Sequence, residues 1–237
     1  MVREAALLAA LSRVRDPELD EPITDLGFVS ELRVDGARVR ARLRLPTYFC
    51  APNFAYLMVA DAREALAGVP GVERADVRLE DHYASAEIND GVGDQRAFET
   101  TFPGEADDDL RELRSIFDRK AFVVRQERLS QALVTAGRPP ESLAELTLGD
   151  LPDLPETTTY LQRRATLGLD LSAGAPFLLR PNGEPIAAED APRQLRFART
   201  VRVSIEANAD LCRGLLHTRY GLATGDDEIT EMEGARG

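Results

Sequence analysis

The chain has 237 residues, of which 43% are hydrophobic and 30% charged, a composition typical of a globular protein with one large or two small domains. Its formal net charge of −12 argues against general nucleic-acid binding, because phosphate contacts would have to overcome the protein's own field. No apolar run approaches the roughly 18 residues of a membrane helix, so we expect a cytoplasmic protein with no nucleic-acid or membrane partner.

The first part of the chain alternates between helical and strand patterns. Asp16-Pro17 ends a first amphipathic helix, and Asp35-Gly36 is a hairpin signal between two strands of period two. Two helices can cover one face of a three-stranded sheet, so we predict a compact α+β unit. The order of its elements is helix, strand, strand, helix and strand, at residues 2–15, 28–34, 38–45, 54–67 and 72–79.

The segment from Asp81 to Asp109 is rich in Gly, Asp, Asn and Glu, which predicts a loop or linker with a short strand at Ser85–Ile88. The remaining pattern is mainly helical: two successive helices between Leu110 and Val134, short helices in 141–170, a small hairpin in 177–186 and a long helix over 192–218.

This division predicts four parts of the chain. They are an α/β domain, a linker, a mainly helical extension and a disordered tail, at residues 1–88, 89–108, 109–222 and 223–237.

Few cysteine and histidine residues are available to bind a metal. Cys50 and Cys212 are too few for a disulfide framework or an all-cysteine site, and His82 and His217 are the only histidines. His82, after the third predicted strand, could supply a ligand or a base, but we interpret it as a lone surface histidine. Cys212 and His217 lie five residues apart on a predicted helix and point away from each other, so we do not expect them to share a metal.

A basic row is also visible on the second predicted strand. Arginines alternate there with apolar residues, and they would lie on one face of the sheet: Arg38, Arg40, Arg42 and Arg44. Such a row could meet an acidic partner, but a solvated sheet face is the simpler interpretation.

Three short motifs follow one another in the predicted α+β unit. They are Asp16-Pro17-Glu18 after the first helix, Asp25-Leu26-Gly27 at the entry to the first strand, and Thr47 with Cys50 before the second helix. In this order the sequence resembles the PaaD/SufT-like metal–sulfur (iron–sulfur) cluster assembly domain family, over about residues 3–81. The sequence departs from the family at Ala51, which separates Cys50 from Pro52, and it lacks the C-terminal cysteine cluster of some members.

The resemblance implies a maturation factor rather than an enzyme. Such a factor assembles or delivers iron–sulfur or related iron centres to a client metalloprotein, for which an iron-dependent oxygenase is a narrower hypothesis, and it binds iron or a cluster transiently. A homo-oligomer that shares a cluster is left open. The candidate metal ligands are Cys50, Asp16, Glu18 and Asp25, and the candidate client-contacting or structural loop residues are Thr47, Asp20 and Gly27.

The candidate ligands could bind a metal, but each of them could also have a purely structural role. A cysteine before a helix N-terminus meets the positive end of the helix dipole, which favours the metal-binding thiolate. Cys50 could equally be a small buried hydrophobic residue, and Asp16 and Asp25 could cap turns. A metal-free interaction or scaffold subunit therefore remains the main alternative function, followed by an unrecognised enzyme or small-ligand binder.

Overall fold

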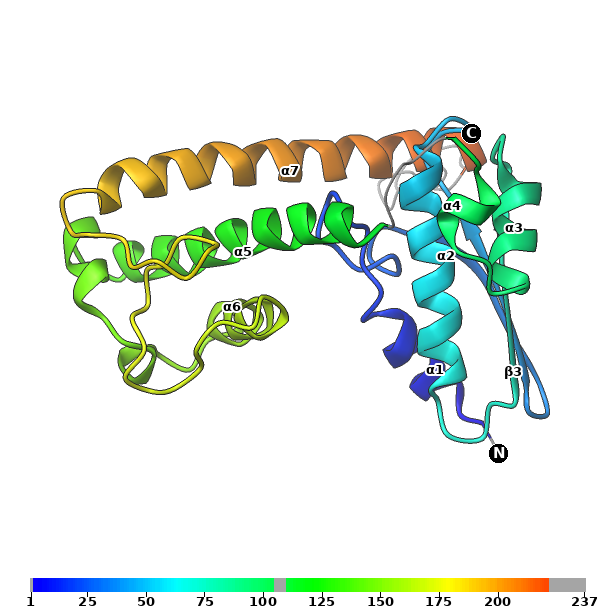
Figure 1. The fold of residues 1–237 in the computed structure, drawn as a ribbon, viewed down its shortest axis with the longest axis horizontal. Helices are drawn as coiled ribbons and strands as arrows, with labels where there is room; N and C mark the ends of the chain where they lie inside the picture. Colours follow the sequence, from blue (N-terminus) through cyan, green and yellow to red (C-terminus); the bar gives the residue numbers. More distant parts are fainter. Residues whose placement is uncertain (1, 105–109, 222–237) are drawn as a thin grey trace, which may run out of the picture. The chain divides into compact units, whose positions relative to one another are not determined.

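The computed structural model describes residues 2–104 and 110–221. The chain divides into two compact units, each described here by itself. The first unit comprises Met1–Leu110 together with the residues from Asn208 onward, and the second comprises Arg111–Ala207. The predicted disordered tail at 223–237 lies outside the described residues. Figure 1 shows the fold, with labels on the α-helices and on strand β3.

The first unit has the predicted order of elements, and the predicted α+β class is confirmed. It contains α1 (Glu4–Leu11), β1 (Val29–Asp35), β2 (Arg38–Arg44), α2 (Pro52–Ala67), β3 (Arg74–Glu80), α3 (Ser85–Gly93) and α4 (Phe98–Thr101). It also contains the last part of α7 (Ala191–Tyr220), from Asn208 onward.

The three strands form one sheet in the order β1-β2-β3. β1 and β2 are antiparallel, and their turn includes Gly36 at a φ of 61°, a backbone conformation that glycine adopts without strain. β2 and β3 are parallel and are connected through α2. Because β2 and β3 run parallel, the chain leaves both strands at the same edge of the sheet.

The alternating pattern of β2 separates a buried face from an open face. Val39, Ala41 and Leu43 are buried, whereas the arginines between them point to the other side. The buried face packs with side chains of α1, α2 and α3, including Leu11, Val59 and Ile88 in addition to the residues of the sheet.

The prediction of a loop over residues 81–109 is wrong for much of its described part, because α3 and α4 lie there. Ile88 and Val92, one helical turn apart, are buried against the sheet, and this burial outweighs the low helix propensity of the surrounding Gly, Asn and Asp residues. The Asn89 side chain accepts from the Leu79 N–H at 2.8 Å and donates to the Leu79 carbonyl at 3.0 Å. The residues predicted as a short strand therefore begin a helix that packs beside β3.

The second unit is mainly helical, as predicted, but its first helix is continuous. α5 (Leu110–Thr135) replaces the two helices predicted there, because the sequence between Phe122 and Leu129 contains no glycine or proline. The predicted hairpin at 177–186 is reduced to a single bridge between Leu179 and Pro185. The other elements are the 3₁₀ helices η1 (Pro140–Glu145) and η2 (Leu148–Asp150), α6 (Pro155–Thr166) and the first part of α7.

Polar side chains lie inside the second unit with specific partners. Gln126 donates to the Leu179 carbonyl at 3.0 Å and accepts from the Leu179 N–H at 2.9 Å. The buried carboxylate of Glu127 pairs with Arg202 of α7 at 2.5 Å, and Arg202 also pairs with Glu206 at 2.6 Å. The charge of Glu127 is therefore compensated inside the protein.

Removing one partner of this buried pair should destabilise the second unit. The Arg202→Met variant leaves the Glu127 carboxylate buried beside no guanidinium, and we expect a loss of about 3 kcal/mol in the free energy of unfolding. The double variant Glu127→Gln/Arg202→Met removes the buried charge as well and should recover most of that loss. Chemical denaturation measures both; a single variant as stable as the wild type would contradict the prediction.

Candidate functional site

Cys50 lies in the loop that leads from β2 into α2. Ala51 precedes the helix, and Pro52 occupies its first turn, where the missing N–H costs nothing. The Cys50 side chain is partly buried at the edge of the hydrophobic core. Its sulfur lies 3.3 Å from the hydroxyl of Thr47.

The Thr47 hydroxyl is oriented by a second contact. It accepts a hydrogen bond from the Phe49 N–H at 3.3 Å, which leaves its own proton free to point at the Cys50 sulfur. Thr47 and Cys50 of this loop are therefore in direct contact.

His82 fixes the backbone of this loop, and the interpretation of His82 as a surface residue is wrong. Its side chain is only 3% exposed, Nε2 lies 2.7 Å from the Cys50 carbonyl oxygen, and Nδ1 accepts from the Ala84 N–H at 3.2 Å. With Nδ1 as the acceptor, Nε2 carries the proton and donates it to Cys50. Burial lowers the pKa of His82 and the charge of Arg219 lowers it further, against the effect of the Cys50 bond, so the imidazole is neutral near pH 7.

The loop before β1 carries the predicted carboxylates, and they play different roles. Asp16 is buried and accepts hydrogen bonds from the N–H groups of Glu18 and Leu19, each at 2.9 Å, so it closes a turn. Burial raises the pKa of Asp16 to about 6 against these two hydrogen bonds. Asp20 lies near Arg15, with 3.7 Å between carboxylate and guanidinium. Asp25 is exposed and accepts from the Thr24 hydroxyl at 3.0 Å.

The last part of α7 packs on the same loops. Arg219 donates to the Leu45 carbonyl at 3.1 Å and also to the Asp81 carbonyl. Leu216 is buried, and its Cδ2 atom lies 3.3 Å from the position that a Cβ would occupy on Gly27, which has a φ of 74°. A larger residue at Gly27 would be strained and would crowd this helix.

The structure brings together only some of the predicted site residues. Thr47 contacts Cys50, and Asp16 and Glu18 lie close enough to Cys212 of α7 to raise the pKa of its thiol. Asp25 is not among these neighbours. Within the described ranges, no three or more histidine, cysteine, aspartate or glutamate residues are arranged to hold a metal ion.

Three aromatic side chains form an exposed cluster beside Cys50. We call Tyr48, Phe49 and Tyr83 the aromatic patch: their ring centroids are 5.1–6.4 Å apart, and Phe49 is 77% exposed. Phe49 directly precedes Cys50 in the sequence, and Tyr83 directly follows His82. Large exposed aromatic groups of this kind are typical of protein interaction surfaces.

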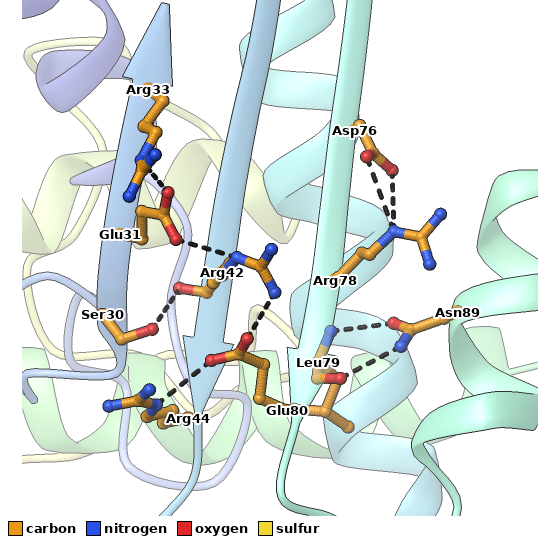
Figure 2. A network of polar contacts seen from close by, with 10 residues as sticks. All are labelled: Ser30, Glu31, Arg33, Arg42, Arg44, Asp76, Arg78, Leu79, Glu80 and Asn89. Carbon is orange, nitrogen blue, oxygen red and sulfur yellow. Dashed lines mark hydrogen bonds and ion pairs between the residues drawn. The ribbon is translucent and has the colours of Figure 1, made fainter.

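The open face of the sheet carries cross-strand ion pairs rather than a bare basic row. Figure 2 shows Arg42 between Glu31 of β1, at 2.8 Å, and Glu80 of β3, at 2.5 Å. Glu80 also pairs with Arg44 at 3.1 Å. Two of the four arginines of the predicted row are thus compensated by neighbouring strands, in agreement with the interpretation of a solvated face.

Comparison with known proteins identifies the class of this fold. Residues 4–77 match the sequence model of the family described as iron–sulfur cluster assembly protein. An uncharacterized protein of Methanocaldococcus jannaschii is 31% identical over 91 residues, which cover 38% of this chain and 94% of that protein. An iron–sulfur cluster carrier protein of Synechocystis is 30% identical over 79 residues, which cover 33% of this chain but 22% of that protein.

The first unit therefore contains a metal–sulfur cluster assembly domain. Through this domain the chain belongs to the iron–sulfur cluster assembly protein family, and its role lies in the assembly or carrying of iron–sulfur clusters. Within residues 2–104 and 110–221, no helix combines the length and the apolar character needed to span a membrane.

Removal of the His82 imidazole should loosen the Cys50 loop. The His82→Leu variant leaves the Cys50 carbonyl and the Ala84 N–H without their partner, and we expect a loss of about 2 kcal/mol in stability. The His82→Gln variant keeps a donor near the position of Nε2 and should lose less. Val34→Leu is the control, because Val34 is exposed and lies beside the hairpin turn, at the other end of the sheet. Thermal unfolding and amide hydrogen exchange over residues 47–51 measure the effect; equal protection in His82→Leu and the wild type would contradict it.

Proposed function

We propose that this protein holds iron or an iron–sulfur cluster transiently at Cys50 and delivers it to a client metalloprotein. The observation that supports this most directly is the environment of Cys50: a partly exposed thiol that contacts a hydroxyl, on a loop held by a buried histidine. Cysteine thiolates are the usual ligands of iron–sulfur clusters. The cargo is here a substrate of the protein rather than a permanent part of it.

The donor set fits temporary binding better than storage. A complete cluster site uses four ligands, most often cysteines, and the described residues contain no ready group of three metal-binding side chains. Ligands supplied by a second protein would complete the site and make the bound centre exchangeable. Asp16 and Glu18 are candidate oxygen ligands near this region, whereas the exposed Asp25 is better placed for contact with a partner.

The aromatic patch supports the delivery part of the proposal. Tyr48, Phe49 and Tyr83 surround the cysteine loop with exposed apolar area, so a client that buries them would also approach Cys50. Thr47, Asp20 and Gly27 belong to the loops that shape this region. The second unit would then contribute to the choice of client, for which an iron-dependent oxygenase is one class that fits such a helper.

The role of Cys50 can be tested by metal analysis. Anaerobically reconstituted wild-type protein should contain iron and sulfide, and the Cys50→Ser variant should lose both while its far-ultraviolet circular dichroism is unchanged. Serine keeps the size of the side chain but replaces the soft sulfur that iron–sulfur clusters require. A Cys50→Ser variant that matches the wild type in iron and sulfide would instead favour a metal-free scaffold.

The role of the aromatic patch can be tested separately. The Phe49→Ser variant should keep its iron content but should transfer its cluster more slowly to a small apo-ferredoxin, because the docking area is reduced. Leu171→Ser is the control, since Leu171 is an exposed leucine of the second unit. Visible circular dichroism of the acceptor follows the transfer. Equal transfer rates for Phe49→Ser and Leu171→Ser would show that the aromatic patch does not contribute to cluster transfer.

A further inference from the structure

A cavity lies inside the second unit, between α5, the first part of α7 and the segment that joins α6 to α7. The two long helices run side by side in this unit (Figure 1), where the ion pair of Glu127 with Arg202 joins them. The cavity has a volume of about 410 Å³, and every residue that lines it belongs to the second unit. Pockets for small molecules are usually of this size, roughly 300–1,000 Å³.

The walls of the cavity are mainly apolar, and the fold holds them in place. Gln126 lines the cavity, but its amide oxygen and nitrogen both bond to the backbone of Leu179, so this side chain fixes a wall. Asn182 and Gln194 add neutral polar groups. The apolar lining comes from all three elements and includes Val123, Leu178, Leu179, Ile186, Leu195 and Ala198.

The charge at this cavity is positive, although the formal net charge of the chain is −12. Arg119 of α5 and Arg180 both line the cavity, whereas no aspartate or glutamate of the described residues does so. The Arg180 guanidinium lies 3.6 Å from the carboxylate of Asp190, which is also 3.5 Å from Arg193. One carboxylate cannot neutralise two arginines, so the cavity attracts an anion.

The cavity opens to solvent at Phe197. This side chain lines the cavity and is nevertheless 64% exposed. A ligand that covers the ring removes apolar surface from water, which favours binding. A small molecule can therefore enter from solvent without unfolding of the unit.

We propose that the second unit binds a small carboxylic acid with an apolar body in this cavity. The body packs against the apolar walls, and the guanidinium groups of Arg119 and Arg180 bind the carboxylate. Guanidinium groups suit this role because their planar donors match the two carboxylate oxygens, and such charge-assisted hydrogen bonds are stronger than neutral ones. The inference goes beyond the function proposed above, since no residue of this cavity belongs to residues 4–77, which match the cluster assembly family.

Calorimetric titration of the full-length protein with octanoate tests the site. One octanoate per chain should bind, and 1-octanol, which has the same chain length without the charge, should bind at least about tenfold more weakly. Arg119→Gln and Arg180→Gln should each weaken octanoate binding about tenfold, because each removes a charged donor. Arg138→Gln is the matched control and should bind as the wild type, since Arg138 is an exposed arginine of the second unit outside the cavity.

Two further measurements locate the ligand and define its body. Ala198→Leu fills part of the cavity and should abolish octanoate binding without lowering the Tm. Titration with 3-phenylpropionate shows whether an aromatic body fits better than an open chain. A wild-type protein that binds neither acid saturably overturns the proposal, as does an Ala198→Leu variant that binds octanoate as the wild type does. Equal affinity for octanoate and 1-octanol overturns the role of the arginines.

Discussion

The parallel pairing of β2 with β3 is the constraint on which the candidate site depends. The last pair in the register is Arg44 with Glu80, so both strands end at one edge of the sheet. The chain after β2 forms the Cys50 loop, and the chain after β3 supplies His82, whose imidazole reaches the Cys50 carbonyl. The Tyr83 N–H donates to the Tyr48 carbonyl at 3.1 Å across the same edge. Any shift of β3 along β2 would separate both contacts at once.

The sequence allowed the order of elements in the first unit to be predicted, because period-two alternation and the Asp35-Gly36 turn are local signals. The position of Cys50 before a helix could also be predicted from local signals, because Pro46 and Pro52 mark the two ends of its loop. The role of His82 was missed. It depends on which strands are neighbours and in which direction they run, and no local pattern around His82 carries that information.

Two further misses have different physical origins. In α3, composition suggested a loop, whereas the single apolar pair Ile88 and Val92 was enough to bury the segment as a helix. In α7, a long helix was predicted, but the packing of its last part, from Asn208 onward, within the first unit was not. Ala209, Cys212 and Leu216 follow one another at helical spacing, and this stripe is the signal that could have suggested a second buried face.

The contact of Asn89 with β3 has a consequence for the behaviour of the protein at high concentration. An outer strand normally presents free N–H and C=O groups that another chain can pair with, which leads to aggregation. Asn89 occupies both backbone groups of Leu79, as Figure 2 shows, so its amide takes the place of a residue from a fourth strand. Helix α3 thereby shields this side of the sheet from edge-to-edge association while the open arginine-bearing face stays accessible to solvent.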